Sequence, residues 1–252
     1  MHADLSFALE LADLADAITT ERFQADDLIV ETKPDLSPVT EADRAVEQVL
    51  RKRIGEERPG HSVVGEEFGA DDPGGARWIL DPIDGTKNYL RGLPVWATLI
   101  ALEREGRVEV GVVSAPALAR RWWAARGEGA FVNGRRIRVS KVGGLSDAVL
   151  SYASLTSWEQ HGLGEQFLTL AKSCWRTRGF GDFWSHMLVA EGAADLAVEP
   201  EVELWDLAAP QVIVEEAGGR FTDLRGISTP AGGSVVSTNG LLHDRVLTTL
   251  RP

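Results

Sequence analysis

The sequence has only one cysteine, Cys174, and no uninterrupted apolar stretch that approaches 18 residues. A single cysteine excludes an intrachain disulfide, and the absence of disulfides is typical of proteins in reducing compartments. A membrane-spanning helix needs about 18 or more apolar residues in a row. The first residues, Met1-His2-Ala3-Asp4, also lack the basic stretch of a secretory signal. We therefore expect a cytoplasmic protein that has no membrane as a partner.

Basic residues are scarce beside acidic ones. The chain has 26 Lys and Arg against 38 Asp and Glu, and its formal net charge is −12 at pH 7. This charge repels nucleic acids and anionic membranes, so we expect no nucleic acid as a partner. It also repels phosphate esters, unless bound cations reverse the local charge. With 252 residues and 44% apolar side chains, the composition is typical of a globular protein with a sizeable core.

The stretch most informative about chemistry is Trp78-Ile79-Leu80-Asp81-Pro82-Ile83-Asp84-Gly85-Thr86. Its apolar start is typical of a buried strand, and Asp81 and Asp84 come where we expect that strand to pass into a turn. Hard cations such as Mg²⁺ prefer carboxylate and carbonyl oxygens, and Ile83 offers a carbonyl between the two acids. Gly85 allows close approach, and a helix opening after it would present N–H groups that suit a phosphate. The alternative is a strand followed by an Asp-rich turn without a ligand.

Further acidic residues could serve the same site. Asp43 follows Thr40 by three positions, the spacing of a capping box, so it either only caps a helix or also orients a hydroxyl at the site. Glu66 and Glu67 follow a short expected strand, although adjacent glutamates in a loop are usually just solvated. Asp206 begins an expected helix, where it is either a cap or a ligand delivered to a cleft between two domains.

The order of expected elements divides the chain into two parts and places it in the α/β class. Residues 1–142 combine helices with an antiparallel sheet, an α+β pattern, and the alternating valines of 108–114 predict a strand with one buried face. Residues 143–252 alternate strands and helices, with one helix expected over 158–174, and supply Asp206. The first part holds most of the candidate metal ligands.

Six segments together are more specific than any one of them: Lys33-x-Asp35-x-Ser37-x-Val39-Thr40-x-x-Asp43, Gly65-Glu66-Glu67, Asp81-Pro82-Ile83-Asp84-Gly85-Thr86, Gly129-x-Phe131-x-Asn133-Gly134, Trp205-Asp206 and Glu216-Ala217-Gly218-Gly219. This set, which covers nearly the whole chain, resembles the inositol monophosphatase family of Mg²⁺-dependent, Li⁺-sensitive phosphatases. The resemblance implies an αβαβα layered sandwich, a homodimer and a small phosphomonoester substrate.

The resemblance also implies a role for each matching residue. It implies two to three Mg²⁺ ions per chain, all with oxygen ligands. The first ion would be held by Glu66, Asp81 and the Ile83 carbonyl. The second would be held by Asp81, Asp84 and Asp206. Glu66 and Glu67 would contribute to a weaker third ion. Glu66, Thr86 and Asp43 would form the catalytic set, with Thr86 and Asp43 acting on the attacking water. The N–H groups of Gly85 and Thr86 would receive the phosphate.

Within that family, the segments 84–98 and 176–182 resemble the bacterial histidinol-phosphate phosphatase branch. Inositol-specific members usually carry Ser or Ala near Asp182, whereas a carboxylate suits the ammonium and imidazole groups of histidinol phosphate. Glu199 matches a position that contacts the alcohol part of the substrate, and Arg178 belongs to the same expected pocket. Alternatively, Asp182 caps an expected helix over 183–192.

Three more side chains are expected near this pocket. Trp96 and Arg91 would line its entrance, and His186, one helical turn after Asp182, would face into it. We therefore predict hydrolysis of L-histidinol phosphate to L-histidinol and phosphate by in-line attack of a metal-activated water. The alternatives are a broad inositol-1-phosphate phosphatase, a fructose-1,6-bisphosphatase, a 3′-phosphoadenosine-5′-phosphate phosphatase and a non-catalytic accessory factor.

Overall fold

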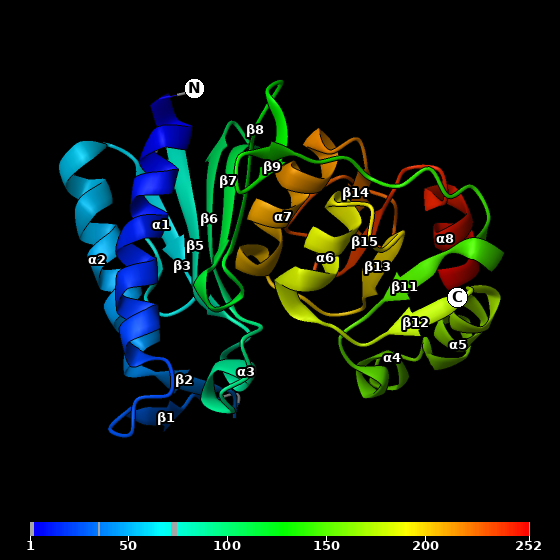
Figure 1. Ribbon diagram of the computed structural model, residues 1–252, viewed down its shortest axis with the longest axis horizontal. Coiled ribbons are helices and arrows are strands. Elements are labelled where there is room, and N and C mark those ends of the chain that lie inside the picture. The colour runs from blue at the N-terminus through cyan, green and yellow to red at the C-terminus, as the bar shows by residue number, and fades with distance from the viewer. Residues whose placement is uncertain (1–2, 35, 72–74, 252) are drawn as a thin grey trace.

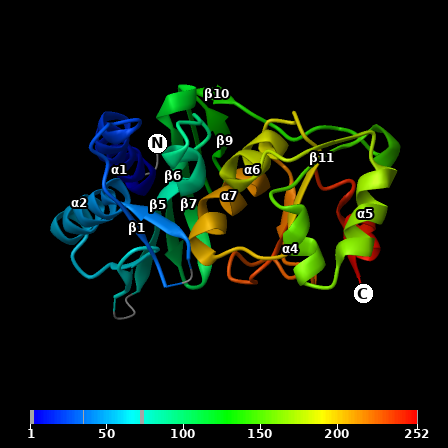
Figure 2. The ribbon, with the colours of Figure 1, turned by 90° about the horizontal axis from the view of Figure 1, so that it is seen from below.

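The computed structural model describes residues 3–34, 36–71 and 75–251, and they form alternating layers of helix and sheet. From one end to the other the layers are α1 with α2, an eight-stranded sheet, α6 with α7, a five-stranded sheet, and α4, α5 and α8 (Figure 1 and, seen from below, Figure 2). This arrangement confirms the predicted αβαβα sandwich. Among the described residues, no helix is both long enough and apolar enough to cross a membrane.

The eight-stranded sheet has the order β10-β9-β8-β7-β6-β5-β3-β4. Its strands are β3 (Ser62–Gly65), β4 (Gly69–Ala70), β5 (Ala76–Asp84), β6 (Ala97–Arg104), β7 (Arg107–Ala115), β8 (Arg120–Ala125), β9 (Gly129–Val132) and β10 (Arg135–Arg136). All neighbours run antiparallel except β3 and β5. The predicted hairpin between β9 and β10 is present, and Asn133 and Gly134 both adopt the positive φ of its two-residue turn.

The prediction that the strand over 108–114 has one buried face is wrong, because helices cover both faces of the sheet. α1 (Ala3–Arg22) and α2 (Glu41–Glu57) pack on one side, and α7 (Leu204–Glu216) packs on the other. β7 is therefore buried throughout from Val110 to Ala115. Gly111 interrupts the valines because α7 passes so close: a Cβ there would lie 2.7 Å from the carbonyl oxygen of Ala209.

The five-stranded sheet has the order β12-β11-β13-β15-β14. Its strands are β11 (Val149–Ser151), β12 (Arg176–Arg178), β13 (Leu196–Glu199), β14 (Arg220–Thr222) and β15 (Val235–Thr238), and the outer layer consists of α4 (Leu155–Gln160), α5 (Gly164–Ser173) and α8 (His243–Leu250). The single helix predicted over 158–174 is two helices, because Gly162 takes a left-handed φ of 72° between them.

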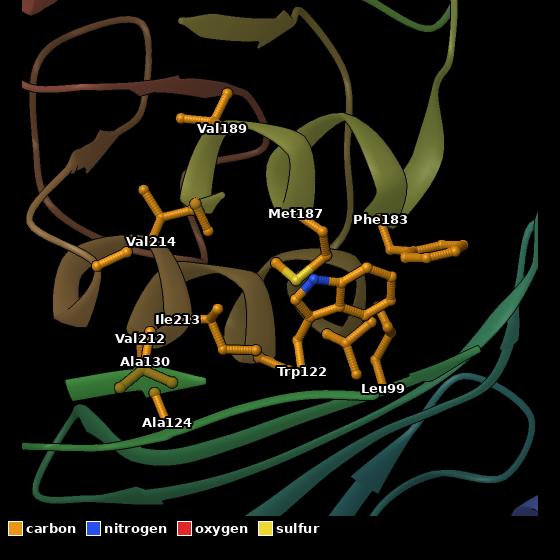
Figure 3. Packing of buried hydrophobic residues seen from close by; sticks show 14 of the residues in the cluster. Leu99, Trp122, Ala124, Ala130, Phe183, Met187, Val189, Val212, Ile213 and Val214 are labelled. Carbon is orange, nitrogen blue, oxygen red and sulfur yellow. The ribbon is translucent and has the colours of Figure 1, made fainter. Parts of the chain in front are cut away.

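The layer between the two sheets joins both parts of the chain in one core. Figure 3 shows Trp122 and Leu99 from the first sheet facing Met187 and Phe183 of α6 (Asp182–Ala190) and Ile213 of α7. All five side chains are essentially fully buried. The second part therefore docks α6 and α7 directly on the sheet of the first, and this contact positions the residues described below.

The remaining elements are short. A two-stranded sheet that the sequence did not predict pairs β1 (Val30–Thr32) with β2 (Pro38–Thr40), and further turns form α3 (Thr86–Leu90), η1 (Pro116–Leu118) and η2 (Leu145–Asp147). β1, β2 and α3 lie together at one end of the first layers (Figure 1). Asp35 of the Lys33-to-Asp43 motif lies outside the described residues.

Candidate active site

The two acids of β5 lie together because the strand is irregular. A spacing of three places side chains on opposite faces of a regular strand. Here Asp81 pairs with Leu99 and Asp84 pairs with Ala97, so a step of three residues in β5 opposes a step of two in β6. This β-bulge re-aims one side chain, and it contains Pro82, which has no N–H to donate to a neighbouring strand. The two acids therefore converge within the strand, not in a turn after it.

Asp206 joins these two acids from the other part of the chain. Asp81, Asp84 and Asp206 each offer a carboxylate oxygen, and the three oxygens lie within 4.8 Å of one another. Asp206 stands in the first turn of α7, where its Oδ2 accepts the main-chain N–H of Glu203 at 2.9 Å. The two interpretations of Asp206 are thus compatible, since it caps α7 and also lies beside the acids of β5.

This group of carboxylates fits a divalent cation. Burial raises the pKa of Asp81 and of Asp84 well above the usual range, and the charges of neighbouring carboxylates raise both further. Burial likewise raises the pKa of Asp206 to about 7. Within the described part of the chain, Oδ1 of Asp81 is buried without a hydrogen-bond partner. Crowded, desolvated oxygen donors of this kind are stabilised by a hard cation such as Mg²⁺.

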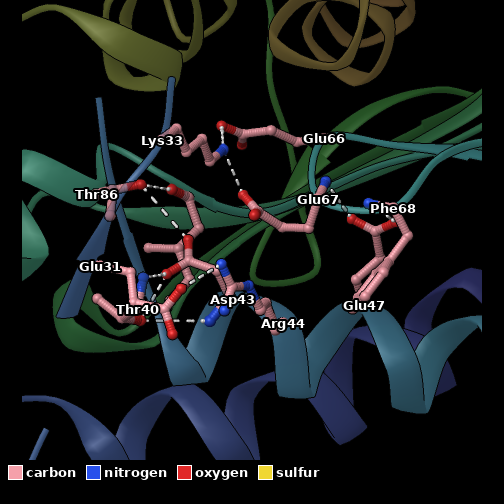
Figure 4. A network of polar contacts seen from close by, with 11 residues as sticks. Glu31, Lys33, Thr40, Asp43, Arg44, Glu47, Glu66, Glu67, Phe68 and Thr86 are labelled. Atoms are coloured by element: carbon pink, nitrogen blue, oxygen red, sulfur yellow. Dashed lines mark hydrogen bonds and ion pairs between the residues drawn. The ribbon is translucent and has the colours of Figure 1, made fainter. Parts of the chain in front are cut away.

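Thr86 and Asp43 lie side by side (Figure 4), and the charge of Asp43 contributes to the raised pKa of Asp81. The Thr86 hydroxyl donates to the carbonyl oxygen of Ile83 at 2.9 Å, and its Oγ1 lies 3.5 Å from Oδ1 of Asp43. The other carboxylate oxygen of Asp43 accepts the N–H of Thr40 at 2.8 Å, which completes the predicted capping box of α2. Asp43 therefore both caps a helix and faces the Thr86 hydroxyl. Burial raises its pKa to about 6.

Glu66 and Glu67 lie on the loop after β3. The ammonium group of Lys33 binds both, at 2.7 Å from Glu66 and 2.6 Å from Glu67 (Figure 4). Glu66 is not part of the close group of three carboxylates, but its charge contributes to the raised pKa of Asp81. It lines a cleft of about 280 Å³ together with Gly85, so it faces the expected phosphate position.

Gly85 and Thr86 form the turn from β5 into α3. Gly85 has a φ of 85°, and a Cβ there would lie 3.0 Å from the carbonyl oxygen of Val95. Both the left-handed conformation and the close approach require glycine. The two residues line the 280 Å³ cleft with Lys87 and Asn88. The predicted phosphate position is therefore open to a ligand.

Asp182 opens α6 with a left-handed φ of 50°, a conformation that Asp tolerates better than most residues. Its Oδ2 accepts a hydrogen bond from the side-chain amide of Asn88 at 3.0 Å. Burial and then the charge of Glu199 raise its pKa to about 6. The main-chain N–H of Phe183, in the first turn of α6, donates to Oδ2 of Asp84 at 2.6 Å and not to Asp182. The Asp182 side chain thus faces the site, and the carboxylate that caps α6 is Asp84.

A second cleft of about 200 Å³ lies next to the three carboxylates. Its lining consists of Asp84, Asp182, Phe183, His186, Glu199, Glu201, Val202, Asp206 and Leu207. His186 faces into it as expected, with Nε2 3.5 Å from Oε1 of Glu199, although only 2% of the residue is exposed. Asp182 borders both clefts, so the two are adjacent. A phosphate in the first and an alcohol group in the second would belong to one ligand.

Three side chains expected at or near the pocket do not border either cleft. Trp96 is fully buried among the rings of Phe23 and Tyr89, so the prediction that it lines the entrance is wrong. Arg91 is exposed after α3. Arg178 lies exposed at the end of the edge strand β12 with its guanidinium on its neighbour's carbonyl, and it does not border either cleft. A larger cavity of about 450 Å³ beside α1 and α2 contains none of the predicted site residues.

Some contacts of the site were not foreseen. Asn88 and the N–H of Phe183 reach the site across 94 and 99 residues of sequence, and neither has a local pattern that could have revealed it.

Comparison with known proteins identifies the family of this chain. The model of the inositol monophosphatase family matches residues 1–252. The chain belongs to the inositol monophosphatase family.

Relatives within the inositol monophosphatase family cover the chain almost completely. A histidinol-phosphatase of Mycobacterium tuberculosis is 58% identical, and the match covers 99% of this chain and 98% of the relative's chain. One of Streptomyces coelicolor is 54% identical, with coverages of 97% and 95%. A solved IMPase structure from Thermotoga maritima is 33% identical, with a TM-score of 0.89 over 99% of this chain and 97% of that chain. The fold predicted from the motifs is thereby confirmed.

Proposed function

We propose that the protein hydrolyses L-histidinol phosphate to L-histidinol and phosphate with the help of Mg²⁺. The lining of the second cleft carries this choice of substrate. Besides Asp84 and Asp206, two of the three clustered acids, it contains Asp182, Glu199 and Glu201, and its described lining includes no Lys or Arg. Ammonium and imidazolium groups pair with carboxylates, whereas a neutral polyol does not need such a charge. The names of the two most similar relatives given above support the same substrate.

The metal ligands are those expected from the family. Glu66, Asp81 and the Ile83 carbonyl would hold one Mg²⁺, and Asp81, Asp84 and Asp206 would hold another, with Glu67 beside a weaker third. When bound, such ions lower the pKa of a water and stabilise charge on the attacking and leaving oxygens. Their positive charge also offsets the repulsion between this acidic protein and a phosphate ester.

The chain's own groups orient the reactants. The Thr86 hydroxyl lies between the Ile83 carbonyl and the Asp43 carboxylate, and it can donate its own proton to either of them. Thr86 Oγ1 can therefore accept a hydrogen bond from the attacking water. Glu66 stands across the same cleft as a second acceptor. The N–H groups of Gly85 and Thr86 bind the phosphate. A P–O bond forms to the water oxygen as the water gives up a proton, the ester P–O bond breaks, and the alcohol oxygen takes up a proton.

The substrate assignment is tested by comparing kcat/KM for L-histidinol phosphate and inositol-1-phosphate at saturating Mg²⁺. We expect at least a tenfold preference for histidinol phosphate. A tenfold preference for inositol phosphate would reject the substrate and keep the metal site, and would favour the broad inositol-1-phosphate phosphatase instead.

We further propose a homodimer in the cytoplasm without nucleic acid partners. The family likeness supports the dimer, and the single cysteine and the net charge of −12 support the other two assignments. Light scattering coupled to size-exclusion chromatography tests the dimer. RNA binding that persists at physiological ionic strength would instead favour an accessory role.

A further inference from the structure

A fully buried carboxylate outside the proposed catalytic set holds the loop that carries Glu66. Glu47 lies on α2 one turn after Asp43, and its side chain is 0% exposed. Its Oε2 accepts the main-chain N–H of Glu67 at 2.8 Å, and its Oε1 accepts that of Phe68 at 3.2 Å. Figure 4 shows Glu47 reaching from α2 to the backbone of this loop.

The residue before Glu66 is glycine because Glu47 occupies the space of a side chain. A Cβ on Gly65 would lie 2.1 Å from Oε1 and 2.2 Å from Cδ of Glu47. Contacts this short do not occur, so any larger residue at position 65 must displace the carboxylate. Gly65 lies in β3 and is not among the glycines with positive φ, so the requirement here is for space. The Gly-Glu-Glu motif and Glu47 therefore form one packed unit.

Burying a carboxylate is costly unless it is paired and hydrogen-bonded. Glu47 is compensated by the Nε–H of Arg51 at 2.8 Å in addition to the two loop N–H groups. An apolar side chain would fill the same space without that cost, but it could not fix the backbone of the loop. The two N–H bonds act on Glu67 and Phe68, immediately after the residue expected to bind metal.

Asp43 and Glu47 are four residues apart and therefore project from the same face of α2. One faces the Thr86 hydroxyl, and the other holds the loop of Glu66 and Glu67. We propose that Glu47 is a positioning residue, which fixes the Gly65–Phe68 loop so that the Glu66 carboxylate is held ready for the first metal ion. This inference rests on the proposed function, because it takes Glu66 as a ligand.

The test is calorimetric titration of Mg²⁺ and Mn²⁺ into metal-free protein, with the melting temperature of each variant measured in chelator. We expect Glu47→Gln and Gly65→Ala each to weaken the first binding event by about ten- to a hundredfold, the range for groups that orient metal ligands. In a Glu47→Ala background, Gly65→Ala should weaken binding no further, since the carboxylate it would displace is gone.

Glu57→Gln is the matched control, because Glu57 is also on α2 and also pairs with an arginine four residues away, Arg53, but its side chain is 44% exposed. It lies about 15 Å further along the helix than Glu47. This substitution should leave metal affinity unchanged. If Glu47→Gln lowers only the melting temperature and binds metal like the wild type, the inference is wrong and Glu47 is merely structural. If Glu47→Gln does not fold, the Gly65→Ala variant decides in the same way.

Glu66→Gln separates this inference from the proposed function. If Glu66→Gln loses affinity while Glu47→Gln and Gly65→Ala keep it, the positioning role is rejected and the proposed ligand set stands. If Glu66→Gln keeps full affinity, Glu66 is not a ligand, and both the positioning role and that part of the proposed function are rejected.

Discussion

The carboxylate of Asp84 accepts the main-chain N–H of Phe183 at 2.6 Å, across 99 residues of sequence. Asp84 ends β5 in the first part of the chain, and Phe183 lies in the first turn of α6 in the second. The positive end of a helix dipole favours an anion, so this contact both fixes one oxygen of Asp84 and favours its charged form. The site is thus assembled where the two parts dock.

Replacing Asp84 by Asn tests the metal assignment. Asn keeps the size of the side chain and an oxygen that can accept the Phe183 N–H, but it removes the charge that a divalent cation needs. We expect kcat for phosphate release to fall by about a thousandfold or more, equivalent to about 4 kcal/mol in the activation barrier. Circular dichroism should show an unchanged fold. Activity within tenfold of the wild type would refute Asp84 as a ligand.

Asp182→Asn tests the recognition of a cationic substrate. Asn also tolerates the left-handed φ of 50° at this position, whereas Ala would add backbone strain. We expect KM for L-histidinol phosphate to rise about tenfold, since a charge-assisted hydrogen bond is lost. KM for the phosphate ester of an uncharged alcohol, such as glycerol phosphate, should stay within about twofold. Equal increases for both esters would mean that Asp182 has a structural role.

The clustered carboxylates make the metal-free protein sensitive to pH. The folded-state pKa of Asp206 is about 7, above its ordinary value of about 3.9. The folded state therefore binds more protons than the unfolded state between these values, and this stability is lost as pH rises through 7. In chelator, the free energy of unfolding of the wild type relative to Asp206→Asn should fall between pH 5 and pH 8.

Added Mg²⁺ should reverse this loss at pH 8, because a ligand at a hundred times its Kd stabilises the folded state by about 2.7 kcal/mol. The same addition should stabilise Asp206→Asn less. Asp206 is not a metal ligand if two results are found together: the free energy of unfolding depends on pH in the same way in wild type and variant in chelator, and Mg²⁺ raises both melting temperatures equally.

His243 on α8 should give the free energy of unfolding the opposite dependence on pH. Its ring is buried between the hydroxyls of Thr222 and Thr238, both at 2.9 Å, and burial lowers its pKa to about 4. The unfolded state, with a pKa of about 6.5, binds the proton more readily. The contribution of neutral His243 is therefore full above pH 6.5 and is lost as pH falls toward 4. Chemical unfolding should show this slope in the wild type and lack it in His243→Phe. Identical slopes would reject the shift.

Local patterns predicted what depends on neighbouring residues. The spacing of Thr40 and Asp43 predicted the capping box, and Asn133-Gly134 predicted the hairpin. The motif around Asp81 and Asp84 predicted a shared acidic site, and the family match confirms the family that these motifs indicated. For the capping box and the hairpin, the residues that decide the geometry lie within a few positions of one another.

What the patterns missed depends on distant packing. The bulge at Pro82 follows from how β6 pairs with β5, and the burial of both faces of β7 follows from α7, about 100 residues later. Trp96 belongs to the segment 84–98 that resembles the phosphatase branch, yet the rings of Phe23 and Tyr89 enclose it away from the entrance. The Asn88–Asp182 contact likewise arises only when the two parts of the chain dock.

The most direct test of the account is phosphate release from L-histidinol phosphate, inositol-1-phosphate, fructose-1,6-bisphosphate and 3′-phosphoadenosine-5′-phosphate, each with Mg²⁺ and with chelator. The account predicts rapid release from histidinol phosphate with Mg²⁺, at least tenfold slower release from the other three, and none in chelator. Release that is undiminished by chelator, or fastest from one of the other esters, would contradict it.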